Sequence, residues 1–136
     1  MNSSNPGTDK PKLLVIEDDY ENQKLIETYL KRKFIISVCD SELTFYEKLK
    51  QDKYDIFLVD ISLRGKKDGL QLVKELRESS EYANAPIICI SAHVFPKDRQ
   101  NAFNAGVDEF LPRPIRNEDM LASIIEVFRN KTGRSI

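Results

Sequence analysis

Short apolar runs alternate along this chain with longer stretches in which apolar residues recur at helical spacing. The runs occupy residues 13–16, 35–39, 56–59, 87–90 and 107–111. Most of them are continuous and rich in β-branched residues, which is typical of strands buried on both faces of a parallel sheet. We therefore predict a strand at each run.

The stretches between the runs predict helices, each with an apolar stripe that we expect to face the core. The stripes are Leu25, Ile26, Tyr29 and Leu30 with Asn22 beside them; Leu43, Tyr46 and Leu49; Leu70, Val73 and Leu76; Ala102 and Ala105; and Leu121, Ile124, Ile125 and Phe128. Asn117 is placed to cap the last of these helices.

Strand and helix alternate five times, an order that calls for a parallel sheet with helices on both faces. We predict an α/β fold with a doubly wound five-stranded parallel sheet. The chain has 136 residues, enough for one domain. We expect a flexible polar leader at 1–11, the domain at 12–130 and a tail at 131–136.

Composition and charge exclude several classes of function. The 21 Lys and Arg residues against 22 Asp and Glu residues leave a net charge of -1, so we expect no nucleic-acid partner. No apolar run approaches the ~20 residues of a membrane span, and the N-terminus lacks the apolar core of a signal peptide. Two cysteines are too few for a disulfide framework or a zinc cage. We expect a cytoplasmic protein with no membrane partner.

Polar residues directly follow the predicted strands, at the edge where parallel α/β sheets carry their functional crevice. Glu17 and Asp18 follow the first strand, Asp60 the third, Ser91 the fourth, and Arg113 comes after the fifth. If the strand order is 2-1-3-4-5, the first and third strands are neighbours, which brings Glu17 and Asp18 close to Asp60. Asp19, which also follows the first strand, is better explained as a helix cap.

Carboxylates that face each other repel, and a hard divalent cation with oxygen ligands removes the repulsion. Mg²⁺ is the cation that this donor set favours. A carboxylate beside Mg²⁺ can attack phosphorus and form an acyl phosphate, a role that we assign to Asp60. Ser91 and Arg113 then supply a hydroxyl and a fixed cation for the remaining phosphoryl oxygens.

Five short motifs, taken in order, resemble the CheY-like receiver domain of two-component response regulators over nearly all of residues 12–130. They are Glu17-Asp18-Asp19 after the first run, Asp60 within Phe57–Ile61, Asp68-Gly69, Ser91-Ala92, and the stretch from Ala105-Gly106 to Arg113-Pro114. Each motif alone is weak, but all five in the right order are specific. The resemblance implies a flavodoxin-like (β/α)5 fold, a three-layer sandwich whose parallel sheet has the strand order 2-1-3-4-5.

The resemblance also implies a function for the acidic edge. Asp60 would accept a phosphoryl group from a phosphohistidine on a sensor histidine kinase or a histidine phosphotransfer protein. Asp18 would bind Mg²⁺ directly and Glu17 largely through water, with the backbone carbonyl of Ser62 as a further ligand. Such a domain catalyses only its own phosphorylation and dephosphorylation, so we do not expect an enzyme with a separate substrate.

Ser91 and Phe110 are the switch residues that the resemblance implies. Ser91 would bind the phosphoryl group, and Phe110 would change rotamer with it. The signal would leave through the face built from the fourth helix, the fifth strand and the fifth helix, toward a downstream protein that the sequence does not name. We expect a monomer or a weak homodimer.

Arg113 is the main departure from the family, which has Lys before the proline. Arg carries a planar fork and Lys a compact charge, so the two are not interchangeable. The family pattern implies a cis Arg113-Pro114 bond.

The leading hypothesis is a stand-alone response regulator receiver. The alternatives are an interaction module that works without phosphorylation, a receiver fragment of a hybrid histidine kinase and, less favoured because Ser62 replaces a second acid, a small phosphohydrolase.

Overall fold

The computed structural model describes residues 10–61 and 68–136 of the chain. Five strands and five helices alternate in this part of the chain, as the apolar periodicity predicts. The strands are β1 (Lys12–Ile16), β2 (Ile35–Cys39), β3 (Ile56–Asp60), β4 (Ile87–Ser91) and β5 (Glu109–Pro112). The helices are α1 (Tyr20–Leu30), α2 (Glu42–Gln51), α3 (Gly69–Glu78), α4 (Pro96–Ala105) and α5 (Asn117–Thr132).

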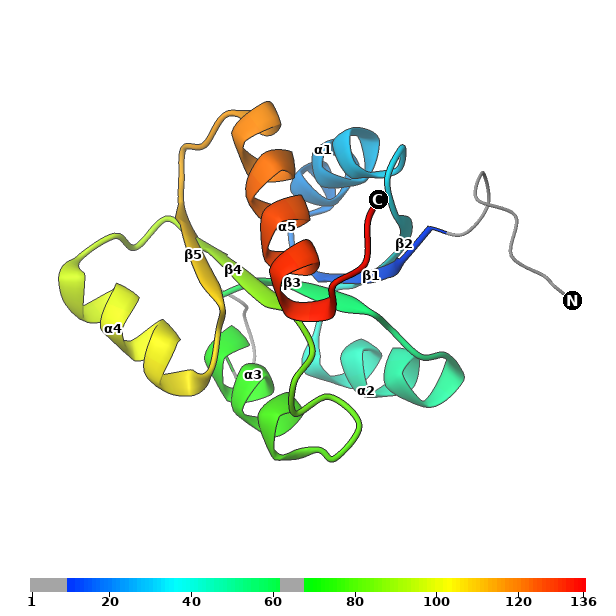
Figure 1. The fold of residues 1–136 in the computed structure, drawn as a ribbon. Helices are drawn as coiled ribbons and strands as arrows, with labels where there is room; N and C mark the ends of the chain where they lie inside the picture. Colours follow the sequence, from blue (N-terminus) through cyan, green and yellow to red (C-terminus); the bar gives the residue numbers. More distant parts are fainter. Residues whose placement is uncertain (1–9, 62–67) are drawn as a thin grey trace, which may run out of the picture.

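All strand pairs are parallel, and the sheet has the order β2-β1-β3-β4-β5, which confirms the predicted topology. Helices α1 and α5 cover one face of the sheet, and α2, α3 and α4 cover the other (Figure 1). This arrangement follows from right-handed crossovers that start on both sides of β1. The carboxyl ends of β1, β3 and β4 therefore lie next to one another at one edge.

Alternate residues of each central strand enter two separate cores. Leu13 and Val15 of β1 pack with α1 and α5, whereas Leu14 and Ile16 pack with α2 and α3. Every residue of β3 and β4 is buried. The continuous apolar runs in the sequence have this cause, because a strand covered on both faces has no side that favours polar residues.

Two of the predicted apolar stripes are wider than the faces that are buried. Leu25 and Tyr29 of α1 and Leu43 of α2 are exposed, although we expected all three to face the core. In α1 the buried residues are Ile26 and Leu30, each one position after an exposed member of the stripe. Consecutive helical residues point about 100° apart, and a helix on the surface of a sheet buries a stripe of about that width.

The start of α5 and the bounds of β5 also differ from the sequence-based expectation. Asn117 is the first helical residue, the N-cap position belongs to Arg116, and no side chain among the described residues caps this helix. Glu118 and Asp119 in its first turn stabilise it through the helix dipole instead.

Strand β5 begins at Glu109 and not at Val107, because the Asp108 side chain accepts a hydrogen bond from the Ile87 N–H at 2.9 Å ahead of the strand.

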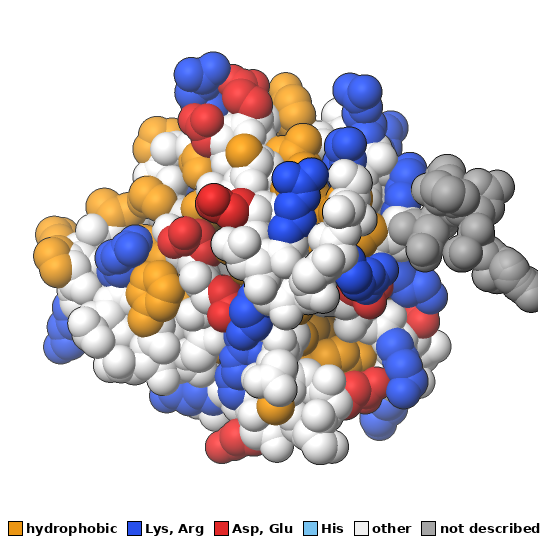
Figure 2. Space-filling view, viewed as in Figure 1, with side chains coloured by type: hydrophobic (Ala, Val, Ile, Leu, Met, Phe, Trp, Pro, Cys, Tyr) orange, Lys and Arg blue, Asp and Glu red, His pale blue; other side chains and the backbone are white. Residues whose placement is uncertain are grey.

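Acidic and basic side chains are interspersed over the face of the molecule that Figure 2 shows, in keeping with the nearly balanced composition. In the described part of the chain, no helix is both long enough and apolar enough to cross a membrane.

Candidate phosphoacceptor site

Three carboxylates meet at the carboxyl edge of the sheet. Glu17 and Asp18 directly follow β1, and Asp60 is the last residue of β3, the neighbouring strand in which Val59 pairs with Ile16. One oxygen from each of the three side chains lies within 4.8 Å of the other two. The strand order thus brings together the acids that the sequence analysis singled out. Their oxygens form a donor set that suits a hard cation such as Mg²⁺.

Glu17 is almost completely buried, with 1% of its surface exposed. Its Oε2 accepts a hydrogen bond from the Asp19 N–H at 3.1 Å, and its Oε1 accepts one from Arg113 Nη2 at 2.7 Å. Burial, reinforced by the neighbouring Asp60 carboxyl, raises the pKa of Glu17 to about 7, against the lowering effects of Arg113 and the Asp19 N–H. The Glu17 carboxyl therefore keeps its proton up to near neutral pH, although Arg113 lies beside it.

Arg113 provides a positive charge at the acidic edge. It follows the last residue of β5, and its side chain reaches past the end of β4. Nη2 lies 2.7 Å from Glu17 Oε1, and Nη1 lies 3.5 Å from Asp60 Oδ2. One planar guanidinium therefore contacts two carboxylates, which the point charge of a lysine does less well. The Arg113-Pro114 peptide bond is cis, as the family pattern implied.

Ser91 is fully buried at the end of β4. It comes one position after Ile90, the residue that pairs with Asp60 across the sheet. Its Oγ accepts a hydrogen bond from the His93 N–H at 2.9 Å, so the hydroxyl is engaged with the connection to α4. Ser91 lies on the strand next to Asp60, as expected, but its oxygen is bound to the backbone of the following loop.

Phe110 lies inside the molecule, with 4% of its surface exposed. It pairs with Cys89 across β4 and β5, and it belongs to the core cluster that contains Ala102 and Ala105 of α4. Ser62, the remaining predicted site residue, lies outside the described residues.

A family model for the response regulator receiver domain matches residues 13–125. The chain belongs to the response regulator receiver domain family. It is therefore a receiver domain of two-component signalling. Receiver domains bind Mg²⁺ at an acidic pocket and interact with histidine kinases or phosphotransfer proteins.

Similar proteins include regulators and kinases. The receiver is 31% identical over 115 residues to the transcriptional activator protein PfeR of Pseudomonas aeruginosa, a match that covers 84% of this chain and 36% of PfeR. It is 36% identical over 122 residues to hybrid signal transduction histidine kinase I of Dictyostelium discoideum, covering 84% of this chain and 7% of the kinase. The chain thus spans about a third or less of the length of these two relatives.

Solved receiver structures have the same fold. A two-component response regulator from Clostridium difficile superimposes with a TM-score of 0.81 at 25% identity, over 90% of this chain and 99% of that one. The receiver domain of a sensor histidine kinase from Pseudomonas aeruginosa, solved with a magnesium ion in its active-site cleft, superimposes with a TM-score of 0.76 at 23% identity, over 92% and 99% of the two chains.

Gly69 belongs to the Asp68-Gly69 motif, but its structural role beside the acidic edge was not predicted from the sequence. Asp68 caps α3 by accepting the Gln71 N–H at 3.0 Å. A Cβ at Gly69 would lie only 2.5 Å from the backbone oxygen of Asp60. Glycine therefore lets α3 approach β3, the strand that ends at Asp60. The signal was the glycine directly after a cap, a position at which a helix gains nothing from glycine.

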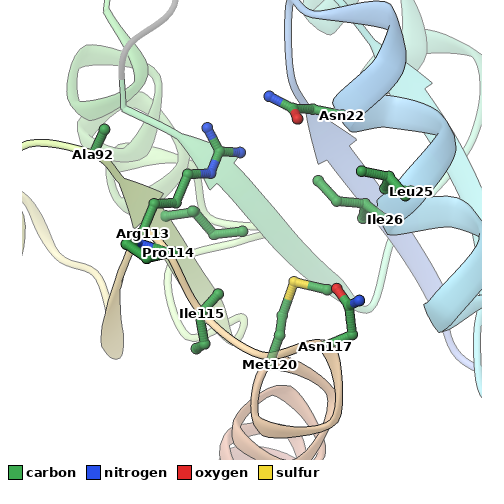
Figure 3. A pocket seen from close by; sticks show the side chains of 10 residues that line it. Asn22, Leu25, Ile26, Ala92, Arg113, Pro114, Ile115, Asn117 and Met120 are labelled. Carbon is green, nitrogen blue, oxygen red and sulfur yellow. The ribbon is translucent and has the colours of Figure 1, made fainter.

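A cavity of about 440 Å³ opens beside the acids, between α1 and the start of α5. Figure 3 shows Asn22, Leu25 and Ile26 of α1 on one side of it, Arg113 on the other, and Met120 of α5 at its lower end. Arg113 is thus part of two features, the wall of this cavity and the acidic edge of the receiver.

Proposed function

We propose that this receiver accepts a phosphoryl group on Asp60 from a phosphohistidine of a sensor histidine kinase or a histidine phosphotransfer protein, with Mg²⁺ bound. The observation that carries the proposal is the position of Asp60. Its carboxylate ends β3 beside two further acids whose oxygens lie within 4.8 Å, and a guanidinium nitrogen lies 3.5 Å from it. A nucleophile, a cation site and a fixed positive charge are therefore in one place.

In the transfer step a carboxylate oxygen of Asp60 forms a bond to phosphorus, and the bond between phosphorus and the imidazole nitrogen breaks. The electron pair of the broken bond stays on that nitrogen. The donor reacts with its other ring nitrogen protonated, so the products are an acyl phosphate and a neutral imidazole. Arg113 pairs with the phosphoryl oxygens as charge develops on them, because its guanidinium is always protonated and carries its donors in a fixed fork.

Glu17, Asp18 and Asp60 would hold the Mg²⁺, with the backbone carbonyl of Ser62 as a further ligand. When bound, the ion neutralises the acids and the incoming phosphoryl oxygens. The magnesium-bound receiver domain of the Pseudomonas aeruginosa sensor kinase supports this assignment by its shared fold.

Phosphorylation would be transmitted through Ser91 and Phe110. Ser91 Oγ leaves the His93 N–H to bind the phosphoryl group, which releases the connection to α4. Phe110 packs against α4 and responds to that movement. The face of α4, β5 and α5 then changes for a downstream protein. The α4 end of this face already exposes Val94, Phe95 and Phe103, and hydrophobic side chains gather over α4 on the left of Figure 2.

The contact of Arg113 with Asp60 favours this function over an interaction module that works without phosphorylation. A guanidinium directed at the acceptor is the arrangement that phosphoryl binding needs. The relatives include transcriptional regulators and hybrid kinases, and the chemistry at Asp60 is the same whether the receiver acts alone or within a kinase. We propose a cytoplasmic protein whose only catalysis is its own phosphorylation and dephosphorylation.

Intact mass spectrometry after incubation with acetyl phosphate tests the function. We expect one phosphoryl adduct on the wild type that requires Mg²⁺ and is absent from Asp60→Asn. Asp40→Asn is the matched control, because Asp40 is an exposed acid that follows β2 at the same edge, and it should behave as the wild type. An adduct that persists in Asp60→Asn would contradict the proposal. So would a wild type that forms neither an adduct nor a beryllofluoride complex.

A further inference from the structure

Glu17 and Asp18 lie between the end of β1 and the start of α1, beyond the strand pairing that holds β1 in the sheet. The pairing of β1 with β3 ends at Ile16 and Val59. The Glu17 N–H still donates to the Cys39 carbonyl at 3.0 Å, but the next peptide group, which joins Glu17 to Asp18, lies outside the sheet. Because a peptide group is planar, its orientation constrains the directions in which both acids leave the backbone.

The side-chain amide of Gln23 holds this peptide group. Its Nε2 donates to the Glu17 carbonyl oxygen at 2.6 Å, across a separation of six residues. A carbonyl oxygen only accepts hydrogen bonds, so the nitrogen of the amide and not its oxygen must face it. An apolar side chain of similar length could fill the same space but could not make this contact.

Gln23 is itself fixed by the first turn of α1. Its N–H donates to the Asp19 carbonyl at 3.0 Å, and the Asp19 side chain caps the helix by accepting the Asn22 N–H at 2.9 Å. The Asp19 N–H in turn donates to Glu17 Oε2 at 3.1 Å. The acidic segment and the start of α1 thus form a ring of hydrogen bonds, which the Gln23 side chain closes at the peptide group between the two acids.

The ring opposes the mutual repulsion of the carboxylates at the edge. One oxygen from each of Glu17, Asp18 and Asp60 lies within 4.8 Å of the other two. Like charges this close push the segment after β1 away from β3, unless other contacts hold it in place. Acids that already point toward a common centre bind a cation more tightly, because less freedom is lost on binding. Hydrogen-bond partners around metal ligands typically change the affinity by about 10–100-fold when they are removed.

We propose that Gln23 is a positioning residue of the Mg²⁺ site: its amide fixes the peptide group between Glu17 and Asp18 and thereby holds both acids toward Asp60. The inference rests on the metal site of the proposed function. It adds a residue of α1 that acts on this site through the backbone and without contact to the ion or the phosphoryl group.

Isothermal titration calorimetry with MgCl2 on the unphosphorylated protein tests the inference. Gln23→Met keeps the approximate length of the side chain but has no donor, and its dissociation constant for Mg²⁺ should be about tenfold higher than that of the wild type. Gln23→Glu is nearly isosteric and adds a negative charge, which by itself would favour a cation. An ionised Glu has no donor, so this variant should also bind Mg²⁺ more weakly than the wild type.

Gln23→Lys restores a donor at the same position. A cavity of about 350 Å³ beside Gln23, between α1 and α2, leaves room for the longer side chain. The added positive charge would by itself weaken Mg²⁺ binding. A dissociation constant between those of the wild type and Gln23→Met, which we expect, therefore reports the restored hydrogen bond.

Gln71→Met is the matched control, because Gln71 is an exposed glutamine in the first turn of α3, a helix that begins at the same edge. Its dissociation constant for Mg²⁺ should stay within about twofold of the wild type. Urea unfolding of the metal-free proteins provides a second control. A purely structural role of Gln23 would lower the free energy of unfolding and leave the dissociation constant unchanged, because calorimetry reports on the folded protein.

Mg²⁺ binding by Gln23→Met within about twofold of the wild type would overturn the inference and leave the proposed function intact. Equal losses of affinity in Gln23→Met and Gln23→Lys, or an unchanged affinity of Gln23→Glu, would overturn it as well. If the wild type and all variants bind no Mg²⁺, the inference fails together with the metal site of the proposed function.

Discussion

Glu17 shows how the setting of one residue changes its chemistry. The side chain is buried beside a second carboxyl, and the Arg113 guanidinium compensates this only in part, so its pKa rises to about 7 from the ordinary 4.5. A carboxyl with a raised pKa binds its proton more tightly in the folded chain than in the unfolded chain. Between pH 4.5 and 7, the metal-free protein should therefore become less stable as the pH rises.

Replacing Glu17 by Gln should remove most of this pH dependence. Urea unfolding of the metal-free proteins measures this effect. Between pH 5 and pH 8, the free energy of unfolding of the wild type should fall more than that of Glu17→Gln, by about 3 kcal/mol at most. Glu21, an exposed acid in the first turn of α1, provides the control, and Glu21→Gln should follow the wild type. Parallel pH profiles for the wild type and Glu17→Gln would show that Glu17 titrates normally.

Arg77 joins several elements at the end of the sheet opposite the acids. From α3, its Nε donates to Gly106 O at 2.8 Å at the end of α4, and its Nη1 donates to Ala85 O at 2.7 Å before β4. Its Nη2 lies 3.0 Å from Asp108 Oδ2, the same oxygen that accepts the Ile87 N–H. One side chain thus connects α3, α4, β4 and the start of β5.

Removing the guanidinium should destabilise the protein without touching the acidic edge. Arg77→Met removes the charged donor from four backbone carbonyls and leaves Asp108 with its contact to Lys131. We expect the free energy of unfolding to fall by about 2–4 kcal/mol. Lys74→Met, on the exposed side of the same helix, should change it by less than about 0.5 kcal/mol. Urea unfolding measures both. Equal effects of the two substitutions would mean that the network around Arg77 adds nothing beyond helix propensity.

The acidic edge exists only in the complete molecule. Its side chains come from the ends of β1 and β3 and from the residue after β5, separated by up to 96 positions in the chain. No single element contains enough ligands for a metal ion. A ligand of this edge therefore binds the folded chain alone and stabilises it as a whole.

Mg²⁺ should accordingly raise the temperature of unfolding. At a hundred times the dissociation constant it adds about 2.7 kcal/mol, equivalent to roughly 8 °C for a chain of this length. Differential scanning calorimetry with and without Mg²⁺ measures the shift. The shift should disappear in the double variant Asp18→Asn/Asp60→Asn and persist in Asp40→Asn. A shift of equal size in all three proteins would place the bound ions elsewhere.

The positions of the strands, their order and the residues at their carboxyl ends could be predicted from the sequence. Apolar runs such as 56–59 are local signals, because a strand covered on both faces needs apolar residues throughout. Once the topology is known, the position of Asp60 beside Glu17 and Asp18 follows from the parallel pairing of β1 with β3. The caps formed by Asp19 and Asp68 are local in the same way.

Features that depend on distances between elements could not be predicted in this way. The exposure of Leu25 and Leu43 depends on how much of each helix the sheet covers, and the need for glycine at Gly69 depends on how closely α3 approaches β3. The raised pKa of Glu17 and the span of Arg113 across two carboxylates require burial and a side-chain path past β4. Periodicity along a chain reports which face of an element is apolar, whereas burial and electrostatics depend on every neighbour in space, and only packing brings those neighbours together.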